Sequence, residues 1–150
     1  MIKFRRAETK DIPALVEARK RQLIDEGAEA LTSIDEELKE YLRKMMASDM
    51  FIQWIAEDDD KLAATGAIIF TEFPPGYSNV SGEKGYVASM YTVPEYRNQG
   101  LASRILERLE NEAKARQIHR LCLGASKMGR PVYEKNGFKE TEVWMEKEIK

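Results

Sequence analysis

Residues 90–103 read Met90-Tyr91-Thr92-Val93-Pro94-Glu95-Tyr96-Arg97-Asn98-Gln99-Gly100-Leu101-Ala102-Ser103, so an apolar run stops at a proline and a helix follows a glycine-bearing turn. Gly100 permits a close backbone approach or a turn conformation that a side chain would obstruct, and Ala102 beside it is small. The first amides of the helix have no acceptor within it, and the helix dipole is positive at that end. The segment therefore predicts a binding site for phosphate groups, above all for a diphosphate.

Two common phosphate-binding motifs do not fit this segment. A Walker A loop needs a Lys-Ser/Thr pair after its glycine, and a dinucleotide-binding fold needs Gly-x-Gly-x-x-Gly; the chain has neither. The alternative to a phosphate site is an ordinary helix N-terminus that follows a strand.

A second segment, Ser126-Lys127-Met128-Gly129-Arg130-Pro131-Val132-Tyr133-Glu134-Lys135-Asn136-Gly137-Phe138, predicts a helix that stops at Asn136-Gly137. Its ending Tyr-x-x-x-Gly-Phe and the earlier spacing Arg97-x-x-Gly100-x-Ala102 together resemble the motifs of the GNAT superfamily of acetyl-CoA-dependent N-acetyltransferases. The resemblance extends from Met1 to about Trp144. It implies a single-domain α/β fold with a mixed twisted central sheet flanked by about four helices.

Composition bounds the class of protein. With 150 residues and 43% hydrophobic residues, the chain is long enough for one buried core, and we expect one domain over residues 1–150. The formal net charge of -2 provides no basic field, so we expect no nucleic-acid partner. Apolar runs such as residues 63–70 are too short for a membrane span, and the N-terminus lacks a signal-peptide core. We therefore expect a cytoplasmic protein without a membrane partner.

The chain has one cysteine and one histidine, Cys122 and His119. They offer no ligand spacing, so we expect no metal site. Leu121-Cys122-Leu123 indicates a buried strand residue rather than a nucleophile.

Hydrophobic periodicity predicts the order β-α-α-β-β-β-α-β-α-β. The expected strands are 2–5, 51–56, 62–70, 85–93, 120–125 and a last strand or strand pair at 138–148; the expected helices begin at Thr9 and Ser33 and span 98–116 and 127–135. Leu101, Ile105, Leu106, Leu109 and Ala113 are expected to face the sheet. Residues 72–84 have no helical or strand period, so we expect a substrate-side loop or an idle hairpin insert.

The resemblance assigns cosubstrate-binding residues. Backbone groups of Tyr91, Thr92 and Val93 would pair with pantetheine, and an amide near Val93 would bind the thioester carbonyl. The diphosphate would lie on Asn98, Gln99, Gly100, Leu101, Ala102 and Ser103, with Arg97 adding charge or forming only a surface ion pair. Ser126 stands where many members have an asparagine that binds pantetheine, and serine is shorter.

The resemblance also assigns a proton donor. Tyr133 matches the family tyrosine that can act as general acid toward the CoA sulfur; packing against Phe138 is the alternative role. For the general base we predict Glu72, with a water chain past Ser89 as the rival and a solvated loop carboxylate as the simpler reading. The branch that acetylates a ribosomal protein has a glutamate where this chain has Leu121, which counts against that mechanism.

We therefore expect acetyl transfer from acetyl-CoA to a primary amine of a small molecule, by direct attack in a ternary complex. The alternatives are a protein lysine or N-terminal acetyltransferase and a non-catalytic acyl-CoA-binding module. The apolar cluster at residues 142–146 suggests a homodimer, and the same residues could instead close the core of the monomer. The link at residues 27–32 is a gate or a plain surface turn.

Overall fold

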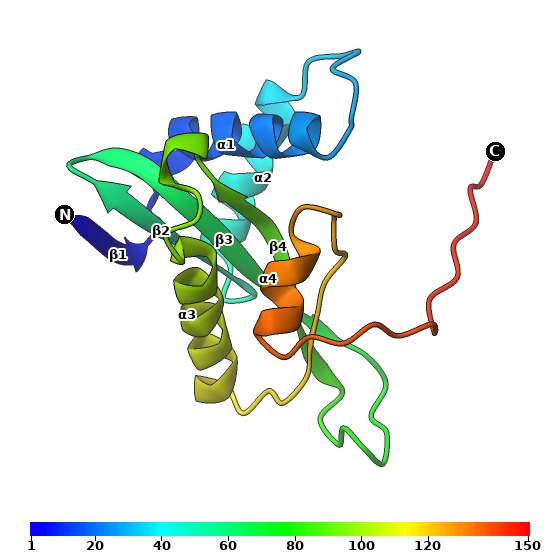
Figure 1. The fold of residues 1–150 in the computed structure, drawn as a ribbon. Helices are drawn as coiled ribbons and strands as arrows, with labels where there is room; N and C mark the ends of the chain where they lie inside the picture. The colour runs from blue at the N-terminus through cyan, green and yellow to red at the C-terminus, as the bar shows by residue number, and fades with distance from the viewer.

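The computed structural model describes residues 1–150, which form one sheet between two layers of helices (Figure 1). The elements are β1 (Ile2–Arg6), a 3₁₀ turn (Thr9–Asp11), α1 (Ile12–Asp25), α2 (Asp35–Met46), β2 (Phe51–Asp58), β3 (Lys61–Glu72), β4 (Glu83–Thr92), a 3₁₀ turn (Pro94–Tyr96), α3 (Leu101–Ala115), β5 (Leu121–Cys122) and α4 (Arg130–Lys135). The sheet order is β1-β2-β3-β4-β5; β1 to β4 are antiparallel, and β5 is parallel to β4. This confirms the predicted mixed α/β fold.

Helix α3 covers one face of the sheet. Its five predicted core positions, Leu101, Ile105, Leu106, Leu109 and Ala113, are all buried. They recur at intervals of three and four residues, so they share one face of the helix. They pack against small and β-branched residues of the strands, among them Ala63 and Ile68. This packing fixes the start of α3 beside the end of β4.

Helices α1 and α2 cover the opposite face. Leu15, Val16 and Leu42 are buried there against Phe51 and Ile55 of β2. Because β2 alternates its side chains between the two faces, it contributes to both cores. Helix α1 runs across this face, and its C-terminal end lies beside β4 (Figure 1).

Two predicted helix caps are wrong. Thr9 begins a 3₁₀ turn, which is capped by a reciprocal box between Glu8 and Asp11, and α1 begins only at Ile12. The Asp11 carboxylate takes this role because Arg5 holds it in place with two hydrogen bonds of 2.8 Å. Helix α2 has Ile34 at its N-cap with no side-chain hydrogen bond, so Ser33 caps nothing.

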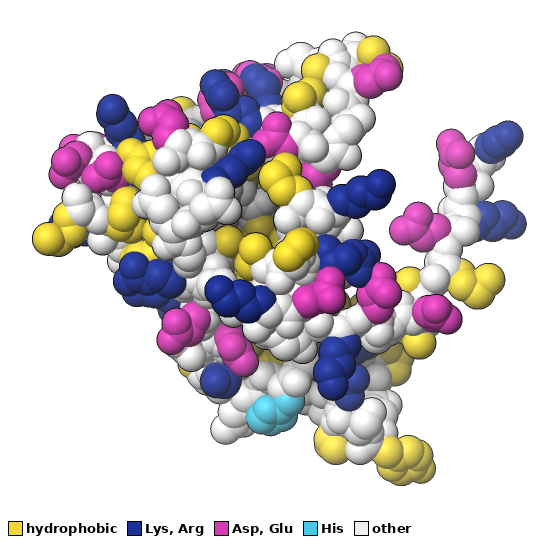
Figure 2. Space-filling model, in the orientation of Figure 1, with side chains coloured by type: hydrophobic (Ala, Val, Ile, Leu, Met, Phe, Trp, Pro, Cys, Tyr) yellow, Lys and Arg dark blue, Asp and Glu magenta, His cyan; other side chains and the backbone are white.

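The strand or strand pair predicted at residues 138–148 is wrong, because residues 136–150 contain no strand. The strand predicted at 120–125 is present but shorter, from Leu121 to Cys122. After α4 the chain leaves the body as an extended segment, with Val143, Trp144 and Met145 exposed by 77%, 65% and 94% (Figures 1 and 2). Alternating apolar residues favour a strand, and a strand also needs an edge to pair with. Here the segment extends away from the sheet and lies against no strand edge (Figure 1).

Residues 73–82 form the tip of the hairpin between β3 and β4. Phe73 N–H donates to the Gly82 carbonyl at 2.9 Å, and Gly76 and Asn79 exchange two backbone bonds inside the tip. The tip projects from the end of the sheet that lies away from α1 (Figure 1). It therefore matches the idle hairpin rather than the substrate-side loop.

Candidate active site

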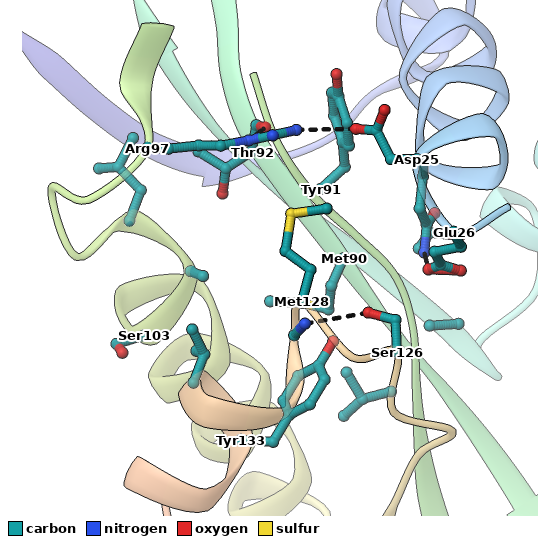
Figure 3. A pocket seen from close by; sticks show the side chains of 18 of the residues that line it. Asp25, Glu26, Met90, Tyr91, Thr92, Arg97, Ser103, Ser126, Met128 and Tyr133 are labelled. Atoms are coloured by element: carbon teal, nitrogen blue, oxygen red, sulfur yellow. Dashed lines mark hydrogen bonds and ion pairs between the residues drawn. The ribbon is translucent and has the colours of Figure 1, made fainter. Parts of the chain in front are cut away.

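A cleft with a volume of about 670 Å³ opens between the C-terminal end of α1 and the start of α4 (Figure 3). Its floor is β4 from Tyr86 to Thr92, and the start of α3 closes one end. This volume lies within the range of about 300–1,000 Å³ that is typical of small-molecule sites. The cleft therefore accommodates an extended ligand that enters along β4.

The strand β4 carries a bulge inside the cleft. Thr65 pairs with Tyr91 and Ala67 with Ala88, so β4 uses one more residue than β3 over this step. The extra residue is accommodated by Ser89, which has a φ of 56° in the left-handed region. Bulges bend and twist a strand and end its regular pairing. Here the bulge, between Ala88 and Tyr91, lies just beyond Tyr86, the last residue of β4 that pairs with β5.

Beyond Tyr86, β4 has a free edge toward the cleft. Pairing with β5 stops at Tyr86 and Cys122, so the edge of β4 from Val87 to Thr92 faces the cleft without a neighbouring strand. Such an edge can pair with the amide groups of an extended ligand. The Val93 amide does not belong to it, because its N–H donates to the Ala63 carbonyl at 2.8 Å. The Val93 N–H is therefore not free to bind a thioester carbonyl in this structure. That another amide near Val93 does so stays a prediction.

The start of α3 closes the phosphate end of the cleft. Gly100 has a φ of 77° and Asn98 a φ of 64°, so the chain turns sharply before the helix. The first helical bond joins Arg104 N–H to the Gly100 carbonyl, and the amides of residues 98–103 have no backbone acceptor. No atom of the chain lies within 4 Å of the place where a Cβ at Gly100 would stand. The left-handed backbone conformation of residue 100 therefore favours glycine. The space beside it is open and can accommodate part of a ligand.

Arg97 bridges the two walls of the cleft. Its Nη2 donates to Asp25 Oδ2 at 2.9 Å, its Nε donates to the Thr92 carbonyl at 2.9 Å, and its guanidinium stacks over the Tyr91 ring. Of the two roles predicted for Arg97, charge at the diphosphate or an ion pair, the structure shows the ion pair. The pair joins α1 to the end of β4.

Tyr133 lies on α4 at the far side of the cleft from α1 (Figure 3). Its ring packs edge to face on Phe138, with centroids 5.9 Å apart, and a Cβ at Gly129 would stand 2.8 Å from the ring. Burial and, second, the negative charge of Glu26 raise the pKa of Tyr133 to about 12. The phenol therefore keeps its proton across the physiological range and can donate it.

Ser126 lines the cleft and shapes the turn before α4. Its Oγ accepts a hydrogen bond from the Gly129 N–H at 3.1 Å. The hydroxyl proton remains able to donate toward the cleft. A structural and a ligand-binding role are thus compatible for this serine.

The cleft brings together most of the predicted site residues. Tyr91, Thr92, Arg97, Asn98, Gly100, Leu101, Ala102, Ser103, Ser126 and Tyr133 line it. Val93, Gln99 and Glu72 do not. Glu72 ends β3 and pairs with Glu83, at the end of the strand that leads into the hairpin tip, so its prediction as a base gains no support.

Sequence reasoning missed the polar residues of α1. Asp25 and Glu26 lie at its C-terminal end, and the buried Gln22 lies one turn earlier; all three line the cleft. In the sequence they look like the solvated end of an amphipathic helix. Only the packing of α1 across β4 turns this end of the helix toward the cleft.

Comparison with known proteins identifies the architecture. Residues 20–148 match the model of the acetyltransferase (GNAT) domain. The chain belongs to the GNAT family of acetyltransferases. Within this family, the turn before α3 and Tyr133 are the features that the sequence motifs had indicated.

Solved structures agree with this assignment. A predicted acetyltransferase with acetyl-CoA from Clostridium acetobutylicum is 51% identical, over 99% of this chain and 96% of that chain, with a TM-score of 0.95. A GCN5-related N-acetyltransferase from Ralstonia eutropha is 25% identical, over 99% of both chains, with a TM-score of 0.92. Glucosamine-6-phosphate N-acetyltransferase from Arabidopsis thaliana, at 19% identity over 100% of this chain and 99% of that chain, shares the fold with a TM-score of 0.78. None of the curated proteins matches the chain at a significant level.

Two further observations concern ligand classes. No helix has the length and apolar character needed to cross a bilayer. No group of three or more His, Cys, Asp and Glu side chains is arranged so that it could hold a metal ion.

Proposed function

We propose that this GNAT protein transfers the acetyl group of acetyl-CoA directly to a primary amine of a small molecule. The observation that carries the proposal is the continuity of the cleft, which runs from the free amides at the start of α3, along the open edge of β4, to Tyr133. Acetyl-CoA has the matching parts in the same order: a diphosphate, an extended pantetheine with two amides, and a thioester.

Each part of the cleft has one task. The amides of residues 98–103 bind the diphosphate, with the positive end of the α3 dipole behind them. The open edge of β4 pairs with the pantetheine amides, which brings the thioester beside Tyr133. Holding the thioester and an amine together in this way can lower the barrier by about 7–11 kcal/mol at most.

The transfer itself needs no enzyme nucleophile. The neutral amine nitrogen attacks the thioester carbon, the N–C bond forms, and the C–S bond breaks. The departing thiolate takes the proton of the Tyr133 hydroxyl, and the nitrogen gives up one proton that returns through solvent to the phenolate. The high pKa of Tyr133, about 12, keeps the donor protonated before each turnover.

Acceptor-dependent release of free CoA tests this function. The enzyme is assayed with acetyl-CoA and a panel that contains benzylamine, 1,4-diaminobutane, glucosamine 6-phosphate, an aminoglycoside and a lysine-containing peptide. We expect thiol release only with a small amine. Release with the peptide alone would favour a protein acetyltransferase, and tight acetyl-CoA binding without release for any acceptor would favour a binding module.

We further propose that the extended C-terminal segment, residues 139–150, pairs with a second copy of this chain. Val143, Trp144 and Met145 are exposed on the segment, and β5 is the last strand of the sheet, with β4 as its one neighbour. In a dimer, the segment of each copy could pair with β5 of the other copy. This arrangement would cover the exposed apolar side chains and the free edge of β5, and it is closed and symmetric.

Sedimentation tests this partner. We expect the full chain to sediment at twice the monomer mass of 17.2 kDa at micromolar concentration. A chain that ends after residue 138 should sediment as a monomer. A full chain that sediments as a 17.2 kDa species would contradict the proposal.

A further inference from the structure

We infer that Glu26 binds the ammonium group of the acceptor and takes the proton that this nitrogen must lose before it attacks. The inference rests on the function proposed above and names the acceptor end of the same cleft. It replaces Glu72, which lies outside the cleft. Glu26 directly follows the last residue of α1, and Figure 3 shows it on the wall opposite Tyr133.

Glu26 is the one carboxylate of the cleft that no cation neutralises. The cleft contains two carboxylates, and the other, Asp25, forms an ion pair with Arg97. Glu26 makes no ion pair. Its carboxylate is therefore available to a cationic ligand, and a protonated primary amine has the charge and the donors that fit it.

A buried amide holds this carboxylate in place. Gln22 Nε2 donates to Glu26 Oε2 at 3.3 Å, and Gln22 Oε1 accepts from Arg19 Nη1 at 3.1 Å. Gln22 is only 9% exposed, so its side-chain amide is fixed between these two partners. Residues three and four apart lie on one side of a helix, which makes Arg19, Gln22 and Glu26 one polar row along the cleft. Gln22 is thus a positioning residue for Glu26.

Glu26 and the proton donor lie on opposite sides of the same space. Both residues line the cleft from different elements (Figure 3), and the negative charge of Glu26 helps to raise the pKa of Tyr133. An amine held by Glu26 and a thioester sulfur beside Tyr133 then face each other across the cleft. This order matches the reaction, in which a proton leaves the nitrogen and a proton reaches the sulfur.

The proton balance closes. An N–H bond of the ammonium breaks and an O–H bond forms on Glu26, which leaves a neutral amine. The amine then attacks as described above, and Glu26, which is exposed to solvent, releases its proton to water. The sum is one ammonium and one acetyl-CoA consumed, and one amide, one CoA thiol and one proton produced.

The first test compares Glu26→Gln with wild type and with Glu17→Gln. Glu17 lies on the same helix, is exposed and lies outside the cleft, so its variant controls for a charge lost from α1. With benzylamine at neutral pH, we expect kcat/KM of Glu26→Gln to fall by about 10²-fold and the affinity for acetyl-CoA to stay within about twofold. The loss should shrink at about pH 10, where much of the amine is already neutral.

Two outcomes separate this inference from the proposed function. If wild type acetylates benzylamine and Glu26→Gln retains kcat/KM within about threefold at neutral pH, the role of Glu26 is wrong and the proposed function stands. If wild type acetylates none of the amines, the proposed function is wrong, and the binding measurement below decides the role of Glu26.

The second test needs no turnover. Titration calorimetry measures 1,4-diaminobutane binding to the protein saturated with CoA. We expect wild type and Glu17→Gln to bind it and Glu26→Gln to bind at least about tenfold more weakly. Equal binding by all three proteins, or binding by none, would overturn the inference.

Discussion

Arg97 and Asp25 form an ion pair across the cleft, with Arg97 Nη2 2.9 Å from Asp25 Oδ2, although the two residues are 72 positions apart in the chain. About one third of each side chain is exposed, at 31% and 35%, so water weakens the pair. The pair holds the end of α1 against the end of β4. It also occupies the arginine that the family motif would direct to the diphosphate.

Removing Asp25 should therefore strengthen cosubstrate binding. In Asp25→Asn a negative charge leaves the cleft and Arg97 becomes free to turn toward the phosphates. Both changes favour an anionic ligand, so we expect the Kd for acetyl-CoA to fall by about two- to fivefold at low salt. The gain should shrink in high salt. Titration calorimetry at two salt concentrations measures it, and weaker binding by Asp25→Asn would contradict this account of Arg97.

Gly100→Glu should abolish acetyl-CoA binding. The new side chain would occupy the open space at the start of α3, place a negative charge beside the diphosphate site, and strain a residue whose φ is 77°. Gly76→Glu introduces the same residue at the hairpin tip, away from the cleft, and should bind like wild type. Calorimetry on correctly folded variants decides the matter. Unchanged affinity in Gly100→Glu would remove the phosphate site.

Tyr133→Phe should reduce turnover and leave binding intact. The variant keeps the ring packed on Phe138 and lacks the proton, so kcat should fall by about 10²-fold while the Kd for acetyl-CoA changes little. Tyr77→Phe, at a fully exposed tyrosine of the hairpin tip, is the matched control. Turnover retained within about twofold, with chemistry rate-limiting, would make Tyr133 a packing residue only.

The pH profile gives an independent check on the same residue. Because burial raises the pKa of Tyr133 to about 12, its donor form persists through the alkaline range in which an exposed tyrosine ionises. We therefore expect that ionisation of Tyr133 does not lower the kcat of wild type up to about pH 10. Any decline in this range should be the same in wild type and in Tyr133→Phe. Such a decline would mean that the phenol ionises more easily than its environment implies.

Asp11 should make the fold acid-sensitive. Hydrogen bonds from Arg5 lower the pKa of Asp11 in the folded state. Its stabilising effect is therefore complete above the unfolded pKa and is lost as the pH falls through the folded one. Asp11→Asn should reduce the free energy of unfolding by about 1–2 kcal/mol at pH 7. The difference from wild type should vanish near pH 2 in thermal unfolding, and Glu36→Gln, at an exposed helix pair, should be silent.

Much of this site could be predicted from the sequence, because the binding of phosphates depends on local chemistry. Gly100 and the helix after it specify a turn and a row of free amides within a few residues of chain. The apolar period of α3 specifies which side of that helix is buried. The short helix before Asn136-Gly137 is likewise predicted locally, while the role of Tyr133 as a proton donor comes from the resemblance to the GNAT family.

The acceptor end depended on contacts between segments far apart in the chain. Glu26 and Asp25 have no local pattern that separates them from a solvated helix end, and only the packing of α1 across β4 brings them opposite Tyr133. The Val93 N–H donates to the Ala63 carbonyl and is not free to bind a ligand. Glu72 lies at the far end of the long strand β3, away from the cleft. The strand predicted at residues 138–148 fails for the same kind of reason. Sequence determines which residues can form a strand, while the tertiary structure determines whether the segment lies against an edge that it can join.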